Sequence, residues 1–244
     1  LASYNFSSKV FEYYGKYEMD LGNSNLNLTG GYSYNQFNTQ GNTFSLGDFP
    51  DNSIDWSEAI GASQDLLNAG YIGANSFASP DDKIIGMFGR ANLVINNKYF
   101  VNASIRREGS SRFGADNRWG LFPSFGVGAD LNEILGLGIR KLKVRASTAT
   151  TGALPGATGL TAQARTFVYD GGGSAGGSTV LARGANPDLK WEEKNEFNFG
   201  IEYETERLSL DFDVYNRKIK DFILNQQVDV AVFGVDRRFQ NAGQ

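Results

Sequence analysis

The sequence contains no cysteine and no histidine among its 244 residues. Without cysteine there are neither disulfide bonds nor thiolate metal sites. Without histidine there is no imidazole base, no serine–histidine–aspartate triad and no imidazole metal ligand. The adjacent carboxylates of Glu192 and Glu193 point to opposite faces of a predicted strand, so they do not flank one bond. We therefore expect neither an enzyme nor a protein that holds a metal or a cofactor.

Long hydrophobic runs are also absent. The sequence has no stretch of about 18 or more apolar residues, so it predicts no transmembrane helix. This absence leaves a membrane barrel open, because barrel strands alternate. The segment from Leu1 to Asn5 lacks the basic and apolar regions of a signal peptide, so we expect none in this sequence. The formal net charge is −4 at pH 7, which argues against nucleic acid as a partner, because such surfaces need clustered positive charge.

What the sequence does contain is glycine and aromatic residues in alternating segments. It has 30 Gly, 18 Phe and 11 Tyr, a bias towards strands and turns. Between Phe11 and Asp20, every second residue is aromatic, apolar or glycine, and four of the five residues between them are charged. This period of two is typical of a strand with two unlike faces. It recurs in Asn25–Phe37, Lys83–Ile95, Tyr99–Arg107, Trp119–Asp130, Lys141–Thr151, Trp191–Glu204 and Leu208–Arg217, with a last strand-like run at Phe222–Val230.

The lengths of these segments and of their connections favour a transmembrane barrel. The predicted strands have about 9–14 residues, nearer to the about 9–11 of a membrane-crossing strand than to the about 5–6 of a soluble one. Short turns largely alternate with longer loops, as periplasmic turns and extracellular loops do in outer-membrane barrels. The turns are Leu21–Ser24, Asn96–Lys98 and Thr205–Arg207, and the loops are Asn38–Asp82, Glu108–Arg118 and Gly152–Lys190. Alternation alone also fits a soluble all-β carbohydrate-binding module, which remains the alternative.

Four motifs in the second half of the chain occur in a characteristic order. They are Ala103–Gly114 (ASIRREGSSRFG), Asn117–Ser124 (NRWGLFPS), Asn186–Glu192 (NPDLKWE) and Val214–Asp221 (VYNRKIKD). In residue types and order they resemble the corresponding segments of SusC-like TonB-dependent transporters. The resemblance extends from about Lys83 to the last residue, whereas the preceding part shows the alternation but no motif.

This resemblance implies an all-β, antiparallel transmembrane barrel of about 22 strands in the bacterial outer membrane, of which the chain supplies about eight or nine. Leu1 to Gln244 would then be part of one TonB-dependent receptor barrel domain, without the plug, the TonB box or the terminal strands. A complete member of this family, which is typical of Bacteroidota, imports glycans or peptides with energy relayed through TonB. It contacts outer-membrane lipid and a SusD-like surface lipoprotein. This segment would provide barrel wall, lumen lining and extracellular loops.

Within such a barrel, the polar side of each strand lines the lumen. Six residues are therefore predicted to line the lumen or contact substrate: Arg90, Asn102, Ser104, Arg106, Asp211 and Asp213. Three aromatic residues of the first long loop are candidates for stacking on sugar rings, although packing of this loop on its own barrel explains them equally well: Trp56, Tyr71 and Phe77. A basic cluster either binds an anionic substrate or holds its loop by hydrogen bonds: Arg106, Arg107, Arg112 and Arg118.

Overall fold

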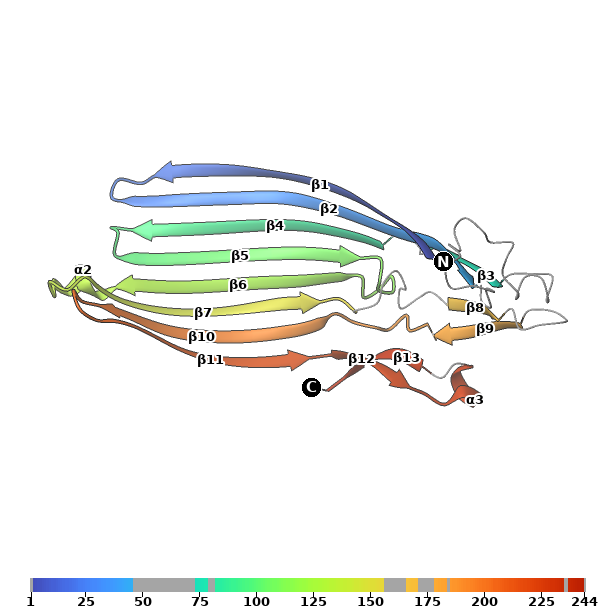
Figure 1. Cartoon of the computed structure of the whole chain (residues 1–244). Coiled ribbons are helices and arrows are strands. Elements are labelled where there is room, and N and C mark those ends of the chain that lie inside the picture. Colours follow the sequence, from blue (N-terminus) through green and yellow to red (C-terminus); the bar gives the residue numbers. More distant parts are fainter. Residues whose placement is uncertain are drawn as a thin grey trace, which may run out of the picture.

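The computed structural model describes residues 2–45, 73–78, 82–155, 166–170, 178–183, 185–234 and 237–243. Its main feature is one long antiparallel sheet, in which eight strands follow one another in chain order (Figure 1). These strands are β1 (Ala2–Asp20), β2 (Ser24–Ser45), β4 (Asp82–Ile95), β5 (Tyr99–Ser110), β6 (Trp119–Asp130), β7 (Lys141–Ala153), β10 (Glu192–Glu204) and β11 (Ser209–Lys220). A ninth, β3 (Gly73–Ala78), pairs with the last residues of β2. The predicted all-β fold with eight or nine antiparallel strands is confirmed.

Two hairpins lie apart from this sheet, both at the same end of the strands (Figure 1). One joins β8 (Thr166–Asp170) to β9 (Ser178–Arg183), and the other joins β12 (Phe222–Gln227) to β13 (Arg237–Ala242). The described helices are short: α2 (Leu131–Leu135) links β6 to β7, and α3 (Val230–Phe233) lies between β12 and β13. No helix in the described part of the chain is long and apolar enough to cross a membrane.

The connections β1–β2, β4–β5, β6–β7 and β10–β11 gather at the opposite end, which we call the turn end; the other is the loop end (Figure 1). The tightest turn follows β4, where Asn96 and Asn97 have φ angles of 52° and 56°. Asparagine tolerates this left-handed conformation, which a two-residue hairpin requires at both central positions. The turn after β10 is closed by Thr205, whose hydroxyl accepts a hydrogen bond from the Leu208 amide at 3.1 Å. The three turns predicted from the sequence therefore lie together at the turn end of the sheet.

The two faces of the sheet differ in chemistry from β2 to β11. Residues directly opposite each other on paired strands share a face. On the apolar face one row crosses seven strands through Leu26, Leu93, Val101, Val127, Ala146, Phe199 and Val214. On the polar face the adjacent row passes through Asn27, Asn92, Asn102, Gly126, Ser147, Asn198 and Tyr215. The register thus keeps the alternation of each strand in phase with its neighbours.

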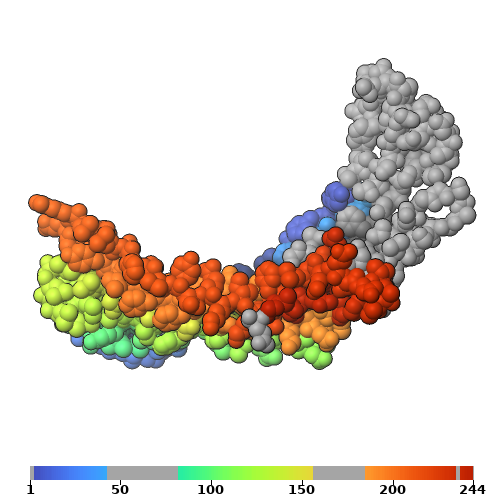
Figure 2. All heavy atoms as spheres, turned by 90° about the horizontal axis from the view of Figure 1, so that it is seen from below, coloured from blue at the N-terminus to red at the C-terminus, as the bar shows by residue number. Residues whose placement is uncertain are grey.

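The sheet is curved, and the crowding of its side chains indicates which face is the inner one. Figure 2 shows the described strands as a bowed layer. On β6, Leu121 and Phe125 of the apolar face are 53% and 49% exposed, whereas Ser124 and Gly126 of the polar face are half-buried and buried. Side chains converge on the inside of a curved sheet and diverge on the outside. The polar face is therefore the concave one.

Several strands are longer than their sequence pattern predicts. β1 begins at Ala2 instead of Phe11, and β2 continues to Ser45 through the predicted start of a loop at Asn38. In this part of β2 polar residues alternate with one another, so no apolar face marks the strand. In β1 the residues Tyr4, Phe6 and Val10 fall on the face opposite to Phe11, so the pattern changes phase there. Pairing from Ala2 to Thr43 extends both strands. The predicted loop Gly152–Lys190 also contains two strands, β8 and β9. By contrast, the strand predicted at Phe222–Val230 is shorter and ends at Gln227.

Candidate functional site

Charged side chains of the polar face form a chain of ion pairs near the turn end. Glu202 of β10 lies 2.5 Å from the Lys141 ammonium and 3.5 Å from the Arg145 guanidinium, both on β7. Arg145 continues the chain to Asp213 of β11 at 2.7 Å. Lys141 and Arg145 lie diagonal to Glu202 on the paired strand, and Arg145 meets Asp213 across Gly200 of β10, which stands opposite both of them. The pairs therefore follow from the register. This ion-pair ladder ties together three neighbouring strands, and its charges largely neutralise one another.

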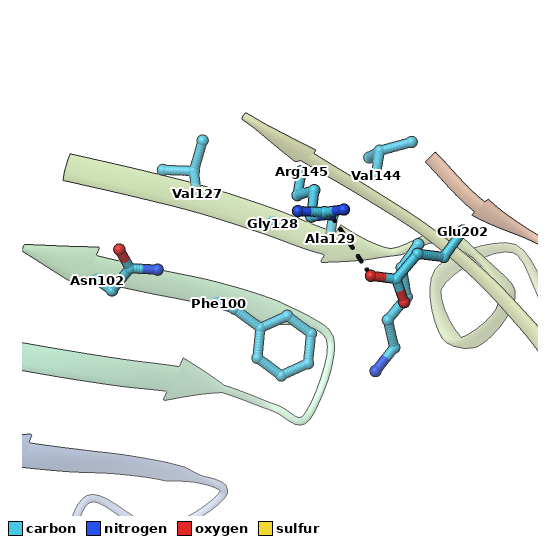
Figure 3. A pocket seen from close by; sticks show the side chains of 9 residues that line it. Phe100, Asn102, Val127, Gly128, Ala129, Val144, Arg145 and Glu202 are labelled. Atoms are coloured by element: carbon cyan, nitrogen blue, oxygen red, sulfur yellow. Dashed lines mark ion pairs between the residues drawn. The ribbon is translucent and has the colours of Figure 1, made fainter. Parts of the chain in front are cut away.

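A shallow depression of about 310 Å³ lies beside the ladder (Figure 3). Its polar lining consists of Asn102, Lys143, Arg145 and Glu202, and Phe100 adds one aromatic ring. The Lys143 ammonium lies 5.0 Å from the centre of the Phe100 ring, a cation–π contact. The depression therefore presents hydrogen-bond donors, acceptors and an aromatic surface, which suit contact with a polar molecule or polypeptide.

The six predicted lumen residues all lie on the polar face, but they form two groups. Asn102, Asp211 and Asp213 lie near the turn end, where Asp211 stands opposite Glu202 and Asp213 belongs to the ladder. The other three lie further towards the loop end: Arg90, Ser104 and Arg106. Their role in lining a lumen stays a prediction, while their common face is what the structure shows.

The second group is held by contacts within the sheet. Ser104 shares a hydrogen bond of 2.7 Å with Ser124 of the next strand, and Arg106 forms an ion pair with Glu108. Arg90 is exposed opposite Ser104. Among the described residues no group of three or more Asp or Glu side chains could hold a metal ion.

Of the three candidate loop aromatics, one lies in the described part of the chain. Trp56 and Tyr71 lie outside the described residues, and Phe77 lies in β3, opposite Gly41 of β2. Their proposed stacking on sugar rings therefore stays a prediction.

A buried hydrophobic cluster lies at the loop end of the described part of the chain and was not predicted. It consists of Phe113, Phe122, Leu189, Trp191 and Phe239, and we call it the loop clamp. Trp191 lies at its centre, with ring centres 4.8 Å from Phe113 and 5.3 Å from Phe122. The Trp191 indole N–H donates to the Arg118 carbonyl at 3.1 Å. The clamp joins residues from the β5–β6 loop, β6, the segment before β10, and β13.

Asn186 supplies the polar centre of the loop clamp. Its side-chain amide donates to the Phe239 carbonyl at 2.7 Å, and its oxygen accepts from the Arg238 guanidinium at 3.0 Å and from the Asp188 amide at 3.2 Å. Asn241 adds a reciprocal pair, because it accepts from the Lys190 amide at 2.8 Å and donates to the Lys190 carbonyl at 3.0 Å. These bonds attach the β12–β13 hairpin to the segment that precedes β10.

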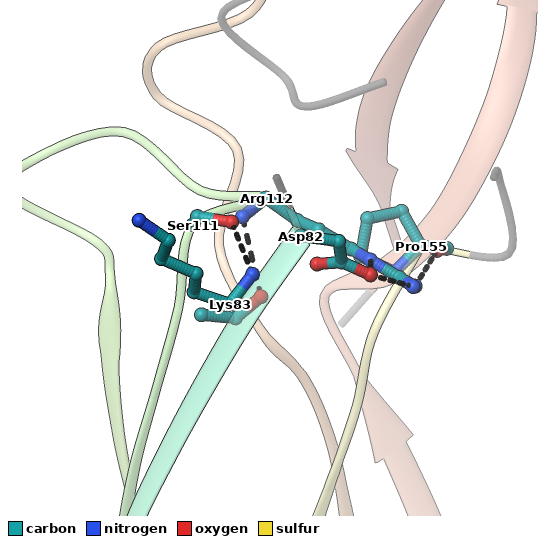
Figure 4. A network of polar contacts seen from close by, with 6 residues as sticks. Asp82, Lys83, Ser111, Arg112 and Pro155 are labelled. Atoms are coloured by element: carbon teal, nitrogen blue, oxygen red, sulfur yellow. Dashed lines mark hydrogen bonds and ion pairs between the residues drawn. The ribbon is translucent and has the colours of Figure 1, made fainter. Parts of the chain in front are cut away.

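Arg112 fixes the other side of the β5–β6 loop (Figure 4). Its guanidinium forms an ion pair with the buried Asp82 at the start of β4 and donates to the Pro155 carbonyl at 2.9 Å. The Ser111 hydroxyl accepts from the Lys83 amide at 2.9 Å. Of the two interpretations of the basic cluster, holding the loop therefore applies to Arg112. Arg107 differs from the rest, since it lies on the apolar face.

Gly114 allows the closest approach in the loop clamp. A Cβ atom at Gly114 would lie 2.0 Å from the Pro187 carbonyl oxygen, so no larger residue fits without moving one backbone away from the other. The motifs around Ser110–Gly114 and Asn186–Trp191, separated by about 70 residues, thus meet through backbone contact. Their residue types are the signal that could have indicated the clamp, because a buried tryptophan and asparagine need partners.

Comparisons with known proteins agree with this β-sheet architecture. Residues 2–244 match the family described as TonB dependent receptor-like, beta-barrel. TonB-dependent receptor P3 of Formosa agariphila is 27% identical over 248 residues, which cover 98% of this chain and 24% of that protein. TonB-dependent receptor SusC of Bacteroides thetaiotaomicron is 29% identical over 175 residues, which cover 66% of this chain and 17% of that protein.

A solved structure of the RagAB peptide transporter contains a chain with the same fold. It superposes with a TM-score of 0.80 at 22% identity, covering 98% of this chain and 26% of that chain. The present chain therefore spans about a quarter or less of the length of these similar proteins.

Proposed function

The chain belongs to the TonB-dependent receptor-like β-barrel family, and we propose that it forms the wall, part of the lumen lining and the rim loops of an outer-membrane importer. As a relative of SusC it lies in the bacterial outer membrane. The eight strands of the main sheet are the described part of a larger closed barrel, to whose single domain residues 1–244 contribute. The polar face lines the lumen, and the apolar face meets lipid.

The observation that carries this proposal is the continuity of the two faces. In every strand from β2 to β11 the convex face is mainly apolar and the concave face is mainly polar. A lipid bilayer outside and a hydrated channel inside require this arrangement. The predicted lumen residues Arg90, Asn102, Ser104, Arg106, Asp211 and Asp213 all have the required orientation.

A soluble carbohydrate-binding module fits the structure less well. Its convex face would expose Phe125, Val127, Phe199 and Phe212 to water, at 49%, 42%, 38% and 60% of their surface. Continuous apolar surfaces of this extent mark membrane or protein contacts and otherwise promote aggregation. No second, covering sheet lies on this face in the described part of the chain.

We infer that the cargo is a glycan or a peptide and that the complete protein acts with TonB and a SusD-like lipoprotein. The RagAB peptide transporter, which contains a chain of the same fold, supports peptides. The resemblance of the four motifs to SusC-like transporters implies glycans or peptides. Deleting the gene of the full-length protein tests this. Uptake of fluorescent oligopeptides or oligosaccharides into energised cells should be lost for one class and restored by the complemented gene. Unchanged uptake of both classes would contradict the proposal.

The orientation in the membrane gives a separate prediction. An epitope tag inserted after Asp116, in the exposed β5–β6 loop, should be reached by antibody on intact cells, because this loop lies at the loop end. A tag inserted after Glu206, in the turn between β10 and β11, should be detected only after the outer membrane is permeabilised. Each tag is placed in the full-length protein, and whole-cell immunofluorescence reads both. Detection of the Glu206 tag on intact cells would reverse the assigned topology.

A further inference from the structure

Charged residues on the apolar face are confined to one end of the main sheet. In its eight strands this face carries six charged side chains, all on the side of the loop end and all but one positive. The single acid is Glu193. The five cations, which we call the basic rim, are Lys9, Lys83, Arg107, Lys218 and Lys220. All five are exposed.

Composition does not explain this excess of positive charge. The whole chain has 23 Lys and Arg against 27 Asp and Glu. The desolvation cost of a charge on the lipid face does not explain the sign either. On this face of a barrel, acidic residues are tolerated at least as well as basic ones. A negatively charged partner along this rim accounts for the sign.

The Arg107 side chain is held in place by stacking on an aromatic ring of the neighbouring strand. Its guanidinium carbon lies 4.9 Å from the centre of the Trp119 ring on the neighbouring strand. The Trp119 ring in turn covers Gly109, where a Cβ atom would lie 2.8 Å from the ring. A stacked guanidinium keeps its planar set of donors, which matches the oxygens of a phosphate group. In the described part of the chain Arg107 forms no ion pair with an acidic side chain.

An apolar groove begins beside Arg107 on the same face. It has a volume of about 600 Å³ and is lined mainly by small residues, among them Gly30, Gly89, Ala91 and Ala103. Ile105, which also lines it, is two residues from Arg107 along β5 and therefore shares its face. Beside the Arg107 guanidinium there is thus space for a hydrocarbon chain. A phosphate-bearing lipid has both an anionic group for the guanidinium and a hydrocarbon chain for the groove.

Resting on the proposed function, which places this face against the membrane, we propose that the basic rim binds lipid phosphate groups of the outer leaflet. Arg107 is the central ligand, and the groove below it receives an acyl chain of the same lipid. The occupant to which the proposal commits is lipid A in its phosphorylated form. Binding of this kind secures the loop end of the barrel at the level of the headgroups.

The test uses the full-length receptor in phosphatidylcholine nanodiscs, titrated with fluorescent lipid A either phosphorylated or dephosphorylated. The wild-type protein should prefer the phosphorylated form. The triple variant Arg107→Gln, Lys218→Gln and Lys220→Gln should lose about fivefold in affinity for each cation removed. The matched control is Lys16→Gln, which removes a cation from the polar face and should bind as the wild type does. Arg107→Lys keeps the charge but loses the planar donors, and should fall between the two.

Two results would overturn the lipid site while leaving the barrel intact. These are equal affinity of the triple variant and the wild type, and equal affinity for the two forms of lipid A. Displacement of lipid A by millimolar inorganic phosphate would indicate a site for the free ion and would also reject the proposal. Heat-dependent mobility on gels checks that every variant is a folded barrel. If the wild-type receptor itself is not recovered from the outer membrane as such a barrel, the proposed function fails together with the lipid site.

Discussion

Replacing Gly114 with alanine is expected to destabilise the barrel by about 3 kcal/mol or more, since overpacking of this kind usually costs about 1–3 kcal/mol. The expected loss lies at or above the upper end of that range because the added Cβ would lie 2.0 Å from a backbone oxygen of Pro187. That backbone has little freedom to move, since the neighbouring Asn186 is buried and bonded to Phe239 and Arg238. The free energy of unfolding of the full-length receptor in detergent, followed by urea titration, measures the effect.

Gly15→Ala is the matched control for this change. Gly15 lies in β1, and a Cβ atom there would meet nothing within 4 Å. The same substitution should therefore alter the unfolding free energy by less than about 1 kcal/mol, as alanine often suits a strand at least as well as glycine. Protease treatment of intact cells gives a second readout. The loops of the Gly114 variant should be cleaved faster, and equal stability of the two variants would show that the loop clamp is not rigid.

The main sheet could be predicted from the sequence because each strand carries its own signal. In β5, Val101, Ala103 and Ile105 alternate with Asn102, Ser104 and Arg106, so the pattern alone assigns the two faces. Residues that favour turns predict where the strands end, as Asn96 and Asn97 do after β4. Periodicity and turns are local properties. They need no knowledge of what the strand packs against.

The outer parts of the long strands lack such a signal. From Asn38 to Ser45 the sequence of β2 is mostly polar on both faces, so a loop is the natural prediction. The segment is a strand because its backbone pairs with the first residues of β1 and with β3. Pairing is a property of two segments at once, and polar strands that extend beyond the apolar band are found only when the partner is known.

The loop clamp shows the same limit in three dimensions. The motif Asn186–Glu192 contributed to the family resemblance but did not predict a buried cluster, because the partners of Trp191, which are Phe113, Phe122 and Phe239, lie far away in the sequence. The predicted basic cluster shows the opposite case, in which neighbours in the sequence lie apart in space. Arg106 and Arg107 are neighbours in the sequence, yet one pairs with Glu108 on the polar face and the other stacks on Trp119 on the apolar face. A cluster of arginines in sequence is therefore not a cluster in space when it lies on a strand.

The assignment of the two faces leads to the second large effect. Arginine at Ala103 should destabilise the barrel by about 2–4 kcal/mol, because a charged side chain on the lipid face near the middle of the bilayer loses its hydration. Ala103 lies in the centre of β5, between Ala91 and Phe125, and has no polar neighbour in its row. Arginine at the adjacent Ser104 should cost only about 1 kcal/mol, the usual value of one hydrogen bond. It removes the bond to Ser124 but leaves the new charge in the hydrated lumen.

Cysteine labelling on the same strand tests the faces without changing a charge, and the sequence contains no cysteine of its own. In the full-length receptor, Asn102→Cys and Ser104→Cys should react with a small water-soluble maleimide, whereas Val101→Cys and Ala103→Cys should be protected by lipid. The four positions alternate along one strand, so depth in the membrane changes little while the face changes completely. Solubilisation in a mild detergent should leave this order unchanged, because the micelle replaces lipid on the same face. If Val101→Cys and Ala103→Cys react as fast as their neighbours in intact membranes, the apolar face does not meet lipid.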